Sequence, residues 1–320
     1  MTENVMMELT WRCGAGCAFC YLGETGRLNR RGPEMTTAEI KAFLRSFPAG
    51  TRFYFTGGEP FLRKDIFSVL GYASSRGFTW GVNTNGLALN RPKIKRLMAL
   101  GPAYVIFSLH GPAAAHDRLT GVKGAHAKVL ANVGIAAELK RPGTEVITNC
   151  VINSANVRLL PAVYLEAARA GADRAIFEHL QFLKKGEAPG LSPAEVMTPF
   201  LPGYRLDTAA FERSVGKITA LRGEFETHFE LRPDFSRREL ARYYNGRMKP
   251  AGACPALLST LNVEPDGRLR TCVLYCAPAG GTVKKLDRAG LRVAKRRLVK
   301  GGLPRGCARC CQRFAIERIF

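Results

Sequence analysis

The feature that most constrains the fold is a regular alternation of short apolar runs and helical patterns along the first 183 residues. Runs rich in β-branched and aromatic residues predict six strands, at residues 5–11, 52–56, 78–83, 104–108, 145–152 and 175–182. Helical patterns fall between them, at residues 36–47, 65–75, 92–100, 125–139 and 158–170. Parallel neighbouring strands need crossover connections, and these helices supply them. The chain is therefore expected to form an α/β fold, a parallel sheet covered by helices.

Each unusual motif of this region stands where a predicted strand ends. These motifs are the cysteine loop 13–20, Gly57-Gly58-Glu59-Pro60, Asn83-Thr84-Asn85-Gly86, Ser108-Leu109-His110-Gly111 and Asn153. In parallel α/β folds, the loops at the carboxyl ends of the strands carry the reactive groups. We therefore expect these motifs to converge on one rim of the sheet.

Three closely spaced cysteines form the first of these motifs. Cys13, Cys17 and Cys20 have the spacing C-x3-C-x2-C, with small residues between them that let the sulfurs turn toward one object. A structural zinc site normally has four closed ligands, whereas an iron–sulfur cube held by three thiolates keeps one iron open for a substrate. The motif favours the cluster, with a zinc knuckle as the alternative.

The charge of the chain points to an anionic partner. Lys and Arg number 48 against 26 Asp and Glu, and residues 284–318 hold twelve basic residues and two acidic ones. Such an excess bears on partners rather than on fold. The basic residues could simply form a solvated surface. The functional interpretation is that they bind an anionic substrate, an acidic protein partner or a nucleic acid. No RNA-binding signature is visible, which makes nucleic acid the minority option.

The cysteine usage indicates a reducing compartment. Ten cysteines occur in a chain whose first seven residues lack the basic residues of a secretory signal, and no stretch is apolar enough to span a bilayer. Disulfide frameworks belong to secreted chains. We therefore predict a cytoplasmic protein.

Three parts are expected along the chain: a barrel core at residues 1–183, a helical linker or covering segment at 184–250, and a small C-terminal unit at 251–320. In the C-terminal unit, residues 258–263 and 268–273 are expected to form a hairpin around Pro265-Asp266-Gly267. Its cysteines are Cys254, Cys272, Cys276, Cys307, Cys310 and Cys311. Two separated cysteines and a C-x2-C pair suit either zinc or an iron–sulfur cluster.

Taken together, the motifs at the strand ends make the chain resemble the radical S-adenosylmethionine (SAM) superfamily. The resemblance implies a partial (β/α)6 barrel similar to a TIM barrel. In that family three cysteines hold a four-iron four-sulfur cluster whose fourth iron binds SAM; Cys13, Cys17 and Cys20 match them. Gly57-Gly58-Glu59-Pro60 looks like the turn that binds the methionyl amino group, since glycines allow close approach and a carboxylate suits an ammonium. The remaining matches imply SAM contacts for Phe19, Tyr21, Asn85, Ser108 and Asn153.

The C-terminal unit resembles the twitch domain, a shortened form of the SPASM extension, which carries an auxiliary four-iron four-sulfur cluster. The matching residues are Cys254, Cys272, Cys307 and Cys310. Cys311 is an alternative to Cys310 as a ligand. Cys150 and Cys276 are left over; Cys276 is the candidate for donating a hydrogen atom to a substrate radical.

The resemblance implies reductive cleavage of SAM to a 5′-deoxyadenosyl radical that abstracts a substrate hydrogen atom, with flavodoxin or ferredoxin as electron donor. No peptide-recognition domain precedes Cys13, and the charge is positive, so we expect oxidation or decarboxylation of a small anionic metabolite. Modification of a ribosomal peptide, by crosslinking or epimerisation, is the alternative. A zinc-binding protein that binds nucleic acid is a remote alternative.

Overall fold

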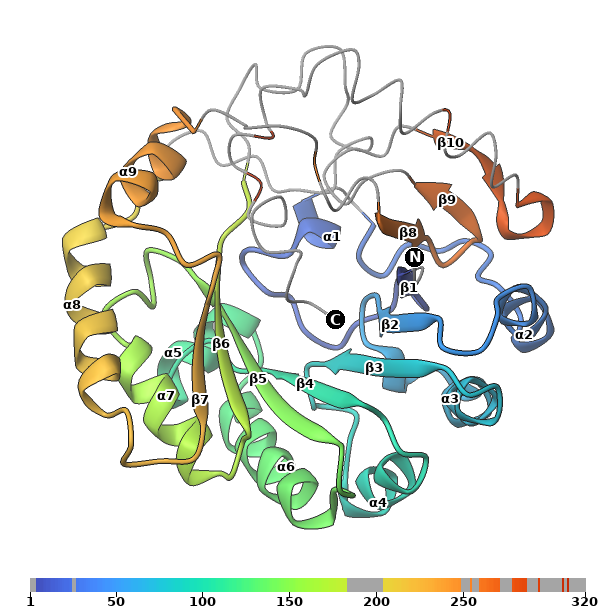
Figure 1. The fold of residues 1–320 in the computed structure, drawn as a ribbon, viewed down its shortest axis with the longest axis horizontal. Helices are drawn as coiled ribbons and strands as arrows, with labels where there is room; N and C mark the ends of the chain where they lie inside the picture. Colours follow the sequence, from blue (N-terminus) through green and yellow to red (C-terminus); the bar gives the residue numbers. More distant parts are fainter. Residues whose placement is uncertain are drawn as a thin grey trace.

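The computed structural model describes residues 4–24, 27–182, 204–248, 254, 259–270, 278–286, 293, 307 and 310. Within this part, ten strands form one curved sheet in the order β10-β9-β8-β1-β2-β3-β4-β5-β6-β7, with helices along its outer side (Figure 1). From β8 through β1 to β7 all neighbours are parallel, whereas β9 and β10 are antiparallel to their neighbours. The predicted partial barrel is confirmed.

The elements follow the predicted alternation closely. The strands are β1 (Asn4–Glu8), β2 (Arg52–Thr56), β3 (Thr79–Thr84), β4 (Tyr104–Ser108), β5 (Glu145–Ile152), β6 (Arg174–His179), β7 (His228–Arg232), β8 (Thr260–Val263), β9 (Arg268–Arg270) and β10 (Pro278–Thr282). The helices are α1 (Tyr21–Glu24), α2 (Thr37–Arg45), α3 (Ile66–Ser75), α4 (Arg91–Ala99), α5 (Ala113–Thr120), α6 (Ala125–Leu139), α7 (Leu160–Arg169), α8 (Thr208–Ala220) and α9 (Arg237–Asn245), with 3-10 turns η1 (Pro60–Leu62) and η3 (Val283–Lys285).

The two faces of the sheet have different chemistry. Side chains alternate along each strand, and one set, for example Val5, Met7 and Phe53, joins the apolar core beneath the helices. Alternate positions such as Glu8 and Asn83 lie on the opposite, concave face. The barrel therefore has an apolar outer layer and a partly polar interior.

Three of the observed elements differ from the predicted ones. β1 ends at Glu8 rather than at residue 11, because the following backbone leaves the sheet to pair with Gly58 and Glu59. Helix α5 was missed. So was β7, which pairs with β6 inside a segment where only helices were expected.

The C-terminal hairpin is continuous with the barrel sheet. β8 and β9 pair around the predicted turn, and β8 pairs in parallel with β1. Arg270 of β9 also reaches Glu8 of β1 at 2.7 Å, with both side chains almost completely buried. Cys272, Cys276 and Cys311 lie outside the described residues. None of the described helices combines the length and apolar character that crossing a membrane requires.

Candidate functional site

The cysteine loop lies between β1 and α1 and is fixed by its own backbone. Gly16 N–H donates to Thr120 O at 2.9 Å and Ala18 N–H to Leu119 O at 3.0 Å, which tie the loop to the end of α5. At its other side, Cys13 N–H donates to Asn29 Oδ1 at 2.9 Å. Contacts of its backbone N–H groups thus hold the loop on both sides.

The three thiols share one electrostatic environment. Burial raises the pKa of Cys13, Cys17 and Cys20, and that of Cys17 reaches about 12 with further contributions from Cys20 and Cys13. Forming three thiolates here requires nearby positive charge, which bound iron supplies. The donor set therefore fits an iron–sulfur cluster. Among the described side chains, no three are arranged to hold a single metal ion; the ligands of a cube bind different irons.

The glycine pair after β2 lets a turn lie directly against the stem of the cysteine loop. A Cβ on Gly57, whose φ is +128°, would stand 2.7 Å from Thr10 O, and one on Gly58 would stand 2.2 Å from Arg12 O. Gly58 N–H and Glu59 N–H donate to those same two carbonyls at 2.8 and 2.7 Å. Only glycine permits this approach, so the motif fixes Glu59 beside the cysteines.

Glu59 is the buried carboxylate of the site. Its Oε1 accepts from Phe61 N–H at 3.0 Å and Thr84 Oγ1–H at 2.8 Å, and its Oε2 accepts from Asn85 N–H at 2.7 Å. Burial raises its pKa to about 7, against the lowering effect of these hydrogen bonds. Burial and hydrogen bonding thus act in opposite directions on the pKa of this carboxyl group.

A cavity of about 350 Å³ opens beside the cysteine loop. Its lining brings Glu59 and Asn85 together with Gly14 of the loop and with the first turn of α6. The lining residues are Gly14, Glu59, Leu62, Asn85, Leu87, Ala88, Val122, Lys123, Gly124, Ala125 and Lys128. The start of a helix and two lysines favour a bound carboxylate. Our sequence analysis missed both lysines, because nothing near them in sequence places them against Glu59.

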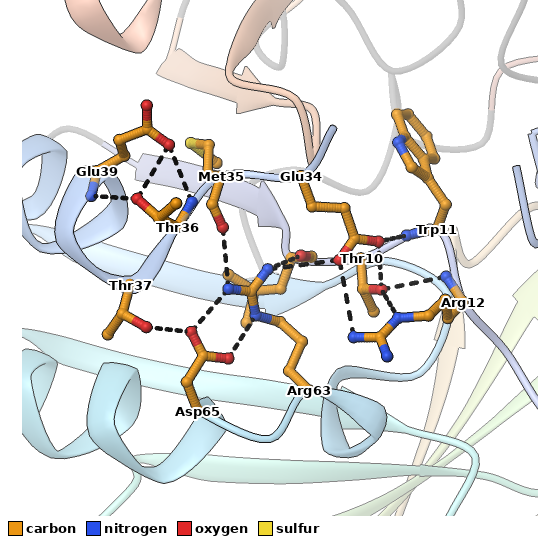
Figure 2. A network of polar contacts seen from close by, with 11 residues as sticks. Thr10, Trp11, Arg12, Glu34, Met35, Thr36, Thr37, Glu39, Arg63 and Asp65 are labelled. Atoms are coloured by element: carbon orange, nitrogen blue, oxygen red, sulfur yellow. Dashed lines mark hydrogen bonds and ion pairs between the residues drawn. The ribbon is translucent and has the colours of Figure 1, made fainter. Parts of the chain in front are cut away.

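A buried arginine clasps the stem of the cysteine loop (Figure 2). Arg63, three residues beyond Pro60, donates to Leu9 O at 2.9 Å and Met35 O at 3.0 Å, and it pairs with Asp65 at 2.8 Å. It also lies 3.6 Å from Glu34, whose carboxylate accepts from Thr10 Oγ1–H at 2.6 Å and Trp11 N–H at 2.9 Å. The clasp joins the glycine turn to the cysteine loop.

The other predicted SAM contacts do not line this cavity. Asn153 caps the loop after β5, with its Oδ1 accepting from Ala155 N–H at 2.9 Å. Tyr21 donates its hydroxyl to Glu8 at 2.9 Å, and Phe19 packs edge-on against His110. Ser108 lies at the end of β4. Their roles toward SAM stay predictions.

The remaining cysteines fall into two groups. Cys150 is 1% exposed and belongs to the apolar core, which is the ordinary role of a spare thiol. Cys254, Cys307 and Cys310 are buried, with 4–7% of each residue exposed. Gln181, which follows β6, places its amide Nε2 2.8 Å from Cys310 Sγ. That Cys254, Cys307 and Cys310 bind an auxiliary cluster together with Cys272 stays a prediction.

Comparison with known proteins agrees with this geometry. Residues 7–154 match the sequence model of the Radical SAM superfamily. That stretch contains the three cysteines, the glycine turn, both cavity lysines and four complete strands of the barrel, β2 to β5. The match to the radical SAM superfamily thus covers the part of the chain that carries the site.

The chain spans about half the length of the first curated relatives it matches. It is 32% identical to the Fe-coproporphyrin III synthase of Methanosarcina barkeri over 57% of this chain and 45% of that protein. It is 33% identical to the PqqA peptide cyclase of Rhodopseudomonas palustris over 56% and 47%. Among solved structures, SuiB of Streptococcus suis bound to its precursor peptide SuiA has a TM-score of 0.67 at 16% identity, over 95% of this chain and 66% of that one.

These findings confirm the predicted fold and the resemblance to the family. SAM and a four-iron four-sulfur cluster, predicted from the resemblance, are the cofactors of that family, and auxiliary clusters are known in related enzymes. The similarity to SuiB bears on the fold alone.

Proposed function

We propose that this chain cleaves SAM reductively and uses the resulting radical to modify a peptide. The observation that carries the first half is the convergence of the cysteine loop, Glu59 and Asn85 on one cavity. When bound, the cluster supplies the electron that splits SAM into methionine and a 5′-deoxyadenosyl radical, which takes a hydrogen atom from the substrate.

The residues of the cavity would orient the methionyl end of SAM. Cys13, Cys17 and Cys20 would hold the cluster, and the ionised Glu59 would accept a hydrogen bond from the ammonium group. Lys123 and Lys128, beside the start of α6, would face the carboxylate. The ammonium and the carboxylate of the methionyl end would thus each face a side chain of opposite charge.

The peptide substrate is proposed from the relatives. PqqA peptide cyclases recur among them, and the structural neighbour SuiB is described with a precursor peptide. These names favour the peptide alternative over our expectation of a small metabolite. Crosslinking or epimerisation are the corresponding outcomes.

A small anionic metabolite is the second candidate. It is favoured by the formal net charge of +22 and by the relative that is named for Fe-coproporphyrin III. Oxidation or decarboxylation is the corresponding reaction.

Isotope transfer distinguishes the two. Anaerobic chain with dithionite and SAM is incubated with PqqA or with Fe-coproporphyrin III, each deuterated at carbon, and 5′-deoxyadenosine is analysed by mass spectrometry. Deuterium arriving from the peptide is expected. Deuterium arriving only from the tetrapyrrole would overturn the peptide proposal. Failure of SAM cleavage under every condition would overturn the enzyme itself, and the Cys13→Ala/Cys17→Ala/Cys20→Ala chain is the blank.

A further inference from the structure

Asn85 joins the cavity to the cysteine loop through its side-chain amide. It follows β3, and its Nδ2 donates to Cys13 Sγ at 3.4 Å across 72 positions of the chain. Within the described residues, the sulfurs of Cys17 and Cys20 have only backbone N–H groups as hydrogen-bond partners. In this part of the chain, Cys13 is thus the one early cysteine whose sulfur accepts from a side chain.

The orientation of this amide is fixed by a second hydrogen bond. Asn85 Oδ1 accepts from Leu87 N–H at 2.9 Å, so the acceptor end of the amide is occupied and its donor end faces Cys13. The backbone N–H of Asn85 donates to Glu59 Oε2 at 2.7 Å. One residue therefore contacts both the buried carboxylate of the cavity and a predicted ligand of the cluster.

Cys13 is held from its other side as well. Its N–H donates to Asn29 Oδ1 at 2.9 Å, and Asn29 Nδ2 donates to Cys13 O at 3.2 Å. Ala15 N–H donates to Cys13 Sγ at 3.4 Å. Because the backbone of Cys13 and the amide of Asn85 are both fixed, the contact between them is preorganised.

An amide N–H that points at sulfur suits a thiolate, the form in which cysteine binds metal. Hydrogen bonds to the sulfurs are one of the factors that set the reduction potential of an iron–sulfur cluster. They offset the negative charge that the reduced cluster carries, and therefore raise its potential.

We infer that Asn85 is a positioning residue for the iron–sulfur cluster: its amide holds Cys13 and raises the reduction potential of the cluster that the three early cysteines bind. The inference rests on the proposed function, which places the cluster on Cys13, Cys17 and Cys20. This role toward the cluster is distinct from the contact with SAM that the resemblance implies for Asn85.

The test measures the midpoint potential of the early cluster in the full-length reconstituted chain without SAM. A redox titration is followed by electron paramagnetic resonance, and the signal of the Cys13→Ala/Cys17→Ala/Cys20→Ala chain is subtracted to remove any other cluster. Asn85→Ser keeps an acceptor for Leu87 N–H but is too short to reach Cys13. Asn85→Leu fills the space without a donor. Both variants are expected to shift the potential to a more negative value.

The matched control is Asn90→Ser. Asn90 is exposed at the start of α4, where its Oδ1 accepts from Lys93 N–H at 3.1 Å. Serine caps a helix as well as asparagine does, so the potential is expected to stay unchanged. A shift as large as that of Asn85→Ser would contradict a role of the contact with Cys13.

The outcomes separate a role toward the cluster from a role in the fold. An unchanged potential in both Asn85 variants at full iron content would overturn the inference. So would a changed far-ultraviolet circular dichroism spectrum of Asn85→Ser, since Asn85 would then serve the fold. Loss of the early cluster from Asn85→Ser with an unchanged spectrum, and its retention in Asn90→Ser, supports the contact. Absence of the early signal from the parent chain would instead refute the cluster, and with it the proposed function.

Discussion

The two sets of cysteines differ in how open they are to solvent. Cys13, Cys17 and Cys20 are partly exposed on a loop beside a cavity, whereas the three described C-terminal cysteines are buried. Zinc sites show the same contrast, since catalytic sites keep an open position and structural sites are closed. This difference in exposure agrees with the proposal that the early cysteines hold a cluster that admits a ligand and that the C-terminal ones hold a cluster enclosed by thiolates.

The two regions are also anchored differently. The early loop is held by the glycine turn and by Arg63, which donates to Leu9 O across 54 residues. The C-terminal hairpin is held by contacts across 262 residues, above all between Arg270 and Glu8. Both regions depend on the finished fold, but the first can be recognised in the sequence because its three cysteines lie within residues 13–20.

The largest effect is expected from removing one cysteine of each set. Cys17→Ala should abolish SAM cleavage, because two thiolates leave the cube without its third ligand. Cys307→Ala should retain formation of 5′-deoxyadenosine but lose modified product. Chromatography of 5′-deoxyadenosine and product, with iron analysis, checks both. Equal loss of SAM cleavage in the two variants would contradict the proposal that the two sets of cysteines have different roles.

Removing each anchoring arginine should destabilise the fold strongly. Arg63→Met leaves Asp65 without its arginine and Glu34 with only Arg12, at 3.8 Å, and the expected cost is about 3–5 kcal/mol in the free energy of unfolding. Arg270→Met should cost a similar amount, because Glu8 is completely buried. Urea unfolding of the reduced, metal-free chain measures both.

The control for the arginines is Arg91→Met, which removes an exposed ion pair with Glu138. It should not change stability measurably. A large effect of Arg63→Met with none of Arg270→Met would mean that the hairpin is not part of the same folding unit as the barrel.

An intermediate effect is expected from pH. Because burial raises the pKa of Glu59 to about 7, its ionised fraction rises roughly tenfold between pH 6 and pH 8. SAM binding through the ammonium should tighten about tenfold over that range. Equilibrium binding of SAM to the reconstituted chain measures it, and Glu59→Gln should bind weakly with a flat profile. The same slope in Glu59→Gln would assign the titration to another group.

Much of this site could be predicted because its chemistry is local. The cysteine spacing and Gly57-Gly58-Glu59-Pro60 point to a cluster and a carboxylate next to each other, and the structure explains the glycines by the carbonyls of Thr10 and Arg12. The strand at residues 104–108 and the helix at 125–139 were predicted to the residue, since the first is a compact run of β-branched and aromatic residues and the second is long and rich in apolar residues.

What could not be predicted depends on packing between distant segments. The β7 sequence His-Phe-Glu-Leu-Arg is short and half polar, and it is a strand only because β6 lies beside it. Lys123 and Lys128 become cavity residues only when α6 packs next to the cysteine loop. Gln181 belongs to no motif, and its contact with Cys310 Sγ joins residues 129 positions apart.

The smallest effect is expected where the two regions touch at the surface. Lys284 of η3 pairs with Glu39 of α2 at 2.6 Å. This hydrogen bond, with those from Thr36, lowers the pKa of Glu39 to about 2. A lowered folded-state pKa contributes stability above the unfolded value of 4.5, and that stability is lost as pH falls toward 2. Lys284→Ala should lower the melting temperature by only about 1 °C at pH 7, because exposed pairs contribute little.

Salt and pH test whether this pair acts only through charge. In 0.5 M salt the difference between Lys284→Ala and the parent chain should vanish, since the Debye length falls to roughly 4 Å. It should also shrink when the pH is lowered below 4. Differential scanning calorimetry at two salt concentrations measures it, with Lys284→Arg as the charge-preserving control. A difference that persisted in high salt would mean that η3 is held to α2 by packing, and that the hairpin is joined to the barrel at its surface as firmly as in its core.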